Sequence, residues 1–167
     1  LPLSHDEVVH GKKSLMHKMF GDRYNQFANL RTMMVWMMAH PGKKLRFMGS
    51  EWGQFLEWRD EEGLEWRDLQ DGMNRSMQHF TAELNKIYRD EHAFWEQDFV
   101  PAGVNFSQTD QGAQGTMALM RHGKKPSDTI IMAMNTLPVQ KDDYRVIVPR
   151  AGRYDVLLNT EDIAFGG

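Results

Sequence analysis

Residues 24–49 read YNQFANLRTMMVWMMAHPGKKLRFMG, and this stretch decides the fold class. Its first part predicts a helix over 24–39, with Asp22 as the N-cap. Apolar residues recur there at helical spacing, at Phe27, Leu30, Met34 and Met37. The end of the segment is apolar on all sides, which indicates a helix buried on more than one face.

The sequence around this helix favours an α/β arrangement. Residues 40–42 (His-Pro-Gly) end the helix, because proline disfavours helical geometry at the residue before it. The apolar run 44–49 predicts a buried strand, and a helix followed closely by such a strand favours a layer with a parallel sheet. A loop rich in tryptophan and charge follows, with Glu-Trp-Arg-Asp at both 57–60 and 65–68. A second amphipathic helix is predicted from about 74 to 89.

The character of the chain changes near residue 100, where helical periodicity gives way to short strand-like runs. The predicted strands are 117–120, 129–134, 144–148 and 153–158, separated by clusters of Gly, Pro, Asp and Lys. This spacing is typical of an antiparallel β-sandwich. We expect at least one further strand, and we expect both ends of the chain to be cuts through a longer polypeptide.

Composition excludes several classes of function. The chain has 167 residues, a net charge of −3 and no cysteine, which excludes disulfides, thiolate zinc sites and cysteine nucleophiles. A nucleic-acid-binding surface needs a basic excess, so we expect no nucleic-acid partner. The longest apolar run, 33–39, is far shorter than a membrane span, so we expect no membrane partner. No signal peptide is visible, and we expect a cytoplasmic protein.

Ionisable side chains concentrate in residues 1–13, which read LPLSHDEVVHGKK. A metal site fits poorly, because His5 and His10 are not one helical turn apart and the Glu-x-x-His run at 7–10 has no second copy. His5 and Asp6 could form only a local polar contact. Alternatively, an imidazole and a carboxylate side by side could hold neighbouring hydroxyls of one sugar ring.

The same segment resembles the fourth conserved region of the α-amylase superfamily, in the form typical of 1,4-α-glucan (glycogen) branching enzymes. Further matching segments follow in the expected order: 27–31 (FANLR), 39–45 (AHPGKKL), 47–54 (FMGSEWGQ), 57–58 (EW), 64–66 (LEW), 143–145 (DYR), 148–149 (VP) and 158–160 (LNT). Any one of these segments is a weak signal, but a series in register is strong. The resemblance therefore favours the sugar site over the two other interpretations.

The resemblance implies a fold. It implies the last part of a (β/α)8 TIM barrel, strands seven and eight with their helices, followed by an antiparallel β-sandwich domain. His5 and Asp6 would end strand seven, and 44–49 would be strand eight, with helices at 24–40 and 74–90. The domains would be 1–98 and 99–167.

The resemblance also implies a chemistry, a retaining transglycosylation that forms α-1,6 branches in α-glucan such as glycogen or amylose. In that family an aspartate is the nucleophile and a glutamate the acid and base, while a third carboxylate, matching Asp6, stabilises the transition state. His5 would hydrogen-bond the same sugar. No metal and no organic cofactor is implied. The nucleophile and the acid would lie upstream, so the chain alone is expected to be inactive and to self-associate through exposed barrel surface.

Further residues are candidates for contact with glucan. Trp52 and Trp58 could stack on sugar rings or pack the loop, whereas packing is the favoured role of Trp66. Glu51 follows the predicted strand eight, where carboxylates of barrels are often functional, although a local structural role is favoured. Two rival functions stay open: another superfamily hydrolase, such as a trehalohydrolase or a debranching enzyme, and a non-catalytic glucan-binding or structural module.

Overall fold

The computed structural model describes residues 2–107 and 115–167. The chain forms two compact units. The first unit contains Leu1–Met34, Lys43–Asn85 and Leu158–Gly167, and the second contains Val35–Gly42 and Lys86–Leu157. Within the described ranges, neither long helix has the length and apolar character needed to cross a membrane.

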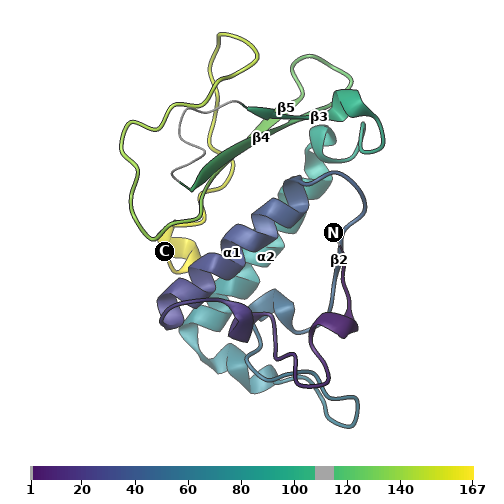
Figure 1. The fold of residues 1–167 in the computed structure, drawn as a ribbon, viewed down its shortest axis with the longest axis vertical. Coiled ribbons are helices and arrows are strands. Elements are labelled where there is room, and N and C mark those ends of the chain that lie inside the picture. Colours follow the sequence, from purple (N-terminus) through teal and green to yellow (C-terminus); the bar gives the residue numbers. More distant parts are fainter. Residues whose placement is uncertain (1, 108–114) are drawn as a thin grey trace. The chain divides into compact units, whose positions relative to one another are not determined.

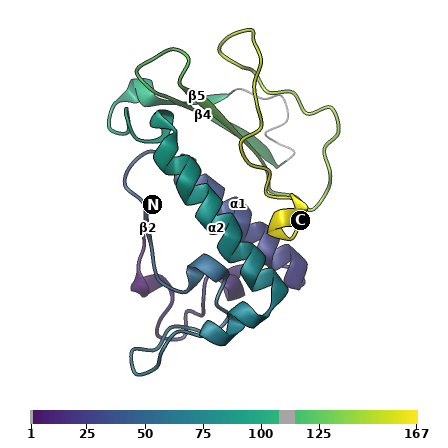
Figure 2. The same ribbon diagram turned by 180° about the vertical axis from the view of Figure 1, so that it is seen from behind.

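Two long helices, α1 (Arg23–Ala39) and α2 (Gly72–Asp90), confirm the two predicted helices. Asp22 caps α1 as predicted, because its Oδ1 accepts the Asn25 backbone N–H at 2.9 Å. The predicted apolar stripe of α1 is buried to 1% exposure or less at every position. Burying one such side chain stabilises the fold by roughly 1.5–3 kcal/mol. In the first unit the two helices run side by side (Figures 1 and 2).

A parallel strand pair lies before and after α1 in the chain. β1 (Pro2–Leu3) pairs with β2 (Leu45–Arg46), in the register Pro2↔Leu45 and Leu3↔Arg46. The predicted parallel arrangement is therefore present, but the strand predicted over 44–49 is only two residues long. Gly49 has a φ of +88°, which is outside the extended region, and a 3-10 helix begins at Ser50.

The second unit contains an antiparallel sheet in the order β3-β4-β5. β4 (Thr116–His122) and β5 (Thr129–Asn135) confirm the predicted strands at 117–120 and 129–134. The strand β3 (Val104–Ser107) was not predicted. A cluster of buried apolar side chains in the second unit consists of Ala39, Phe94, Leu119 and Met132.

Two predicted strands, 144–148 and 153–158, are wrong, because the structure assigns neither of them to a strand. A strand requires a backbone ladder with a neighbour. The backbone carbonyl of Ile147 accepts a hydrogen bond from Ser107 Oγ of β3 at 3.1 Å, which is a side-chain contact and not a ladder bond. Val156 is 84% exposed, so the alternation in its segment does not bury an apolar face.

A buried arginine joins β4 to several other parts of the second unit through one ion pair and three hydrogen bonds. Arg121 of β4 donates to Asp98 Oδ1 at 2.6 Å, and the two side chains are 1% and 0% exposed. The same guanidinium donates to the carbonyls of Gly103, Ala39 and Phe94 at 3.1, 2.9 and 3.0 Å. Arg121 therefore satisfies backbone carbonyls that would otherwise be buried without a donor.

The last ten residues belong to the first unit. Arg31 of α1 is buried, and it donates to the Phe165 carbonyl at 3.2 Å and to Glu161 Oε1 at 3.1 Å. The Phe165 ring also packs edge-on against Phe80 of α2, with ring centroids 5.4 Å apart. The predicted domain boundary after residue 98 remains a prediction. Residues 158–167 belong to the first unit and not to the unit that contains the antiparallel sheet.

Candidate functional site

The predicted site residues His5 and Asp6 lie directly after β1, in a 3-10 helix that spans His5–Glu7. Ser4 caps this turn, because its Oγ accepts the Asp6 backbone N–H and donates to Asp6 Oδ2, both at 3.3 Å. The His5 and Asp6 side chains are 57% and 71% exposed. Both groups are therefore open to a ligand at the carboxyl end of a parallel strand.

His5 has a polar and an apolar neighbour. Its Nε2 lies 3.4 Å from Asp6 Oδ1, so the local polar contact that stood as the alternative to a sugar site is present in the structure. The His5 ring also lies beside Phe47 and Trp58, with centroid distances of 6.1 and 6.4 Å. Phe47 and Trp58 form a T-shaped pair at 5.0 Å. The imidazole that contacts the Asp6 carboxylate thus lies next to an aromatic wall formed by Phe47 and Trp58. This combination suits a sugar, which has both hydroxyl groups and apolar faces.

A carboxylate from the later loop holds the turn that follows Asp6. Glu57 accepts the backbone N–H of Gly11 at 2.7 Å through Oε1 and that of Lys13 at 2.6 Å through Oε2. These two hydrogen bonds, first from Gly11 and then from Lys13, lower the pKa of Glu57 below its ordinary value. The sequence showed the Glu57-Trp58 pair but gave no signal for this contact.

The other predicted candidates lie in less accessible positions. Trp52 is 3% exposed, and its ring lies 4.7 Å from that of Trp66, which is 61% exposed. Of these two rings, Trp66 therefore offers the larger surface to solvent. The Glu51 carbonyl accepts Thr81 Oγ1 at 2.9 Å. Burial lowers the pKa of Arg46, and the charge of Glu51 counteracts that shift, so Glu51 interacts with a neighbour inside the fold.

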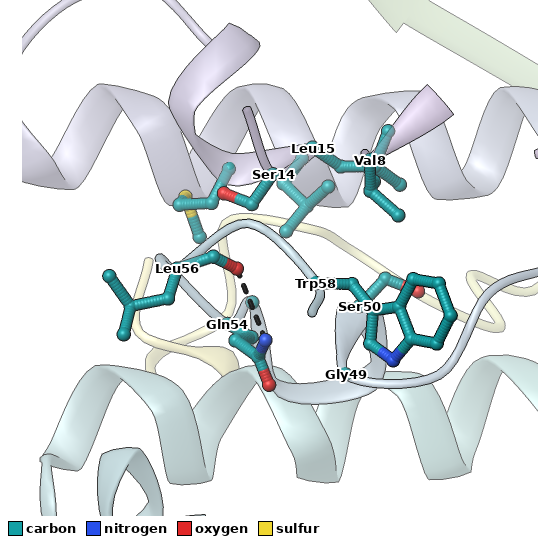
Figure 3. A pocket seen from close by; sticks show the side chains of 11 residues that line it. Val8, Ser14, Leu15, Gly49, Ser50, Gln54, Leu56 and Trp58 are labelled. Atoms are coloured by element: carbon teal, nitrogen blue, oxygen red, sulfur yellow. Dashed lines mark hydrogen bonds between the residues drawn. The ribbon is translucent and has the colours of Figure 1, made fainter. Parts of the chain in front are cut away.

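A cavity of about 20 Å³ is lined by Trp58 together with residues of the 8–16 segment and of the 49–56 loop (Figure 3). Its polar lining includes Ser14, Ser50 and Gln54, and the Gln54 amide donates to the Leu56 carbonyl at 3.1 Å. A space of this size holds about one water molecule and is far too small for a glucose ring. Sugar binding would therefore use the open surface at His5 and Asp6 and not this cavity.

Within the described ranges, one group of potential metal ligands stands out, in the second unit. Ligand atoms of His92, Glu96 and Asp128 lie within 4.8 Å of one another. Glu96 already accepts the Lys124 backbone N–H at 2.7 Å, and the Lys124 ammonium lies 4.0 Å from its other oxygen. Glu96 therefore already has a hydrogen-bond donor and a nearby cation among the residues of the second unit.

Comparison with known proteins gives a consistent result along the whole chain. Residues 106–167 match the family model described as alpha amylase, C-terminal all-beta domain. The chain is 60% identical over 167 residues to the 1,4-alpha-glucan branching enzyme of Lactiplantibacillus plantarum, and 46% identical to those of Lactobacillus acidophilus and Halothermothrix orenii. In each case the match covers 100% of this chain but 26% of the relative. The chain thus spans about a quarter of the length of these relatives and matches their C-terminal region.

Proposed function

Along its whole length this chain is a relative of the C-terminal region of 1,4-alpha-glucan branching enzymes, and we propose that it serves their reaction as part of a longer enzyme. The reaction is a retaining transglycosylation that forms α-1,6 branches in an α-glucan such as glycogen. The observation that carries the proposal is the exposed His5–Asp6 pair, placed after β1 in the segment that resembles the fourth conserved region of the superfamily.

Asp6 and His5 have distinct roles in this proposal. The reacting sugar develops positive charge as its glycosidic bond breaks, and a nearby carboxylate stabilises that charge. Asp6 supplies the carboxylate and accepts hydrogen bonds from ring hydroxyls. His5 donates a hydrogen bond to the same sugar. Trp58 forms part of the aromatic wall beside the sugar. Trp52, which is 3% exposed, is assigned to packing of the loop after β2, and Glu51, whose carbonyl accepts Thr81 Oγ1, supports the same loop.

We assign the first unit to the last two strand–helix repeats of a (β/α)8 barrel. Support comes from the order β1, α1, β2, α2 together with the parallel pairing of β1 and β2, which is the connectivity of a βαβ unit. The antiparallel sheet of the second unit corresponds to the all-β domain of the family.

The chain alone is proposed to be inactive. A retaining reaction needs a nucleophilic carboxylate and an acid on two sides of one glycosidic bond. Asp60 and Asp68 lie in the loop between β2 and α2 and do not follow a strand, so neither is placed as a barrel nucleophile. Both missing groups are assigned to the part of the enzyme that this chain does not include.

A chimeric enzyme tests the proposal. The matching C-terminal quarter of the Lactiplantibacillus plantarum branching enzyme is replaced by this chain, and branching of amylose is followed by iodine staining together with a reducing-sugar assay. We expect the stain to shift without release of reducing ends, and no activity from this chain alone. Asp6→Asn should lower kcat about 100-fold or more, by analogy with removal of one stabilising group of an oxyanion hole.

Asp60→Asn is the matched control, because it also converts one exposed carboxylate to an amide. This control should keep full activity. Release of reducing sugar by the chimera would instead support a hydrolase. Full activity of the Asp6→Asn enzyme would refute the role given to Asp6.

A further inference from the structure

The turn that follows the His5–Asp6 helix has an unusual backbone. His10, Gly11 and Lys13 have φ values of +57°, +79° and +66°. Glycine adopts this left-handed region readily, but residues with a side chain do so rarely. Such conformations persist where the surrounding structure determines them, and they concentrate at functional sites.

Glu57 provides that surrounding structure. The N–H groups of Gly11 and Lys13 point to the same carboxylate, and each bonds a different oxygen. Backbone N–H groups in a turn of this kind form a concave site for an anion. Glu57 lies 46 residues after Gly11 and 44 residues after Lys13 in the sequence, so this is a tertiary contact and not a local turn motif.

The turn held by Glu57 is connected to the site in two ways. Lys12, between the two bonded amides, donates from Nζ to the Asp6 carbonyl at 2.7 Å. The neighbour of Glu57, Trp58, donates its backbone N–H to the Val8 carbonyl at 3.1 Å. The first contact ties the 10–13 turn back to Asp6, and the second connects the loop after β2 to the segment that carries the site.

We propose that Glu57 is a positioning residue for Asp6: it fixes the 10–13 turn, so that Lys12 holds the backbone of Asp6 and Trp58 lies beside His5. This inference rests on the proposed function and adds a residue to it. Glu57 itself does not touch the sugar. Loss of its two bonds releases the turn and allows Asp6 to move, and a misplacement of about 1 Å can cost up to about 100-fold in rate.

The charge of Glu57 fits this role. Besides the bonds from Gly11 and Lys13, the charges of His10 and Arg59 also lower its pKa, while desolvation opposes them. The Glu57 carboxylate is therefore ionised at neutral pH. In this form both of its oxygens can accept the hydrogen bonds from Gly11 and Lys13. A glutamine at this position would present an NH2 group to one of the two N–H donors, and one bond would be lost.

The test is a double-mutant cycle in the chimeric enzyme described above. Glu57→Gln should lower kcat about 10-fold or more with little change in KM, because the positioned Asp6 acts mainly in the transition state. Combined with Asp6→Asn, it should lower the rate no further than Asp6→Asn does alone. Glu61→Gln is the matched control, an exposed glutamate of the same loop, and should retain wild-type rates.

Each result decides between the two proposals. If Asp6→Asn is harmless, the proposed function fails. If Asp6→Asn is severe but Glu57→Gln stays within about twofold of Glu61→Gln, only the positioning role fails. If the two effects multiply, Glu57 acts independently of Asp6 and the inference is overturned, since coupled residues give non-additive changes. Circular dichroism of each variant checks that all enzymes compared are folded.

Discussion

Replacing Asp98 with alanine leaves the guanidinium of Arg121 in the core of the second unit without its counter-ion. The two side chains are 0% and 1% exposed and 2.6 Å apart, so water does not replace the lost carboxylate. Removing one partner of a buried pair destabilises a protein by about 3–5 kcal/mol. Arg121 keeps its bonds to three carbonyls, which partly solvate the charge, so we expect about 3 kcal/mol.

Asp155 offers a matched control for this change. It forms an ion pair of nearly equal length with Arg153, 2.7 Å, but the two side chains are 67% and 87% exposed. Exposed pairs contribute little, because water screens them and solvates the remaining partner. Asp155→Ala should therefore change the free energy of unfolding by less than about 0.5 kcal/mol.

The assay is urea unfolding together with hydrogen exchange of the β4 amides, which reports on the second unit separately from the first. A loss of about 3 kcal/mol corresponds to a fall in Tm of roughly 6–12 °C for a protein of this size. If Asp98→Ala and Asp155→Ala destabilise β4 equally, or if the effect of Asp98→Ala is below about 1 kcal/mol, the argument from burial is refuted.

Two further predictions concern the first unit. Asn74 is buried, and its side-chain amide donates to the backbone carbonyls of Trp52 and Gly53 at 2.7 and 3.2 Å. Asn74→Ala leaves both carbonyls without this donor, so it should lower the free energy of unfolding by about 1–3 kcal/mol, measured by urea titration. An unchanged urea midpoint would contradict this. For Glu57, the amide-proton shifts of Gly11 and Lys13 should titrate together at a pH below the ordinary glutamate pKa of 4.5. Because the folded-state pKa is lowered, the stabilisation is complete above the ordinary pKa and is lost as the pH falls through the lowered value. Glu57→Gln should abolish this titration, and a midpoint above 4.5 would contradict the assignment.

The helices were predictable because their signals are local. The Asp22 cap, the apolar stripe and the His-Pro-Gly stop all lie within or next to α1, and its predicted span differs from the observed Arg23–Ala39 by one residue. The strands were less predictable, because a strand depends on a partner elsewhere in the chain. β3 carries a clear alternation, Val104 and Phe106 against Asn105 and Ser107, but the run is only four residues long. The segment 144–148 alternates as well and forms no ladder.

The candidate site likewise contains residues that the sequence could predict and others whose placement it could not. His5 and Asp6 could be predicted because they are adjacent in a motif. The sequence identifies the three tryptophans of the loop but not which of them is buried. Packing is the role that the sequence favours for Trp66, which is 61% exposed, and it decides nothing for Trp52, which is 3% exposed. Which of several nearby rings turns inward is decided by tertiary packing, and no periodicity records it.

The 10–13 turn shows why the support of a site is harder to predict than the site itself. Glycine at position 11 predicts one left-handed residue there, whereas the structure has three, including His10 and Lys13. Each of those two costs about 1–3 kcal/mol of backbone strain, so local sequence alone argues against the observed turn. The turn forms because Glu57, 46 residues beyond Gly11, accepts its N–H groups. A short motif can therefore identify the residues that meet a ligand, while the residue that fixes their geometry becomes visible only after the chain has folded.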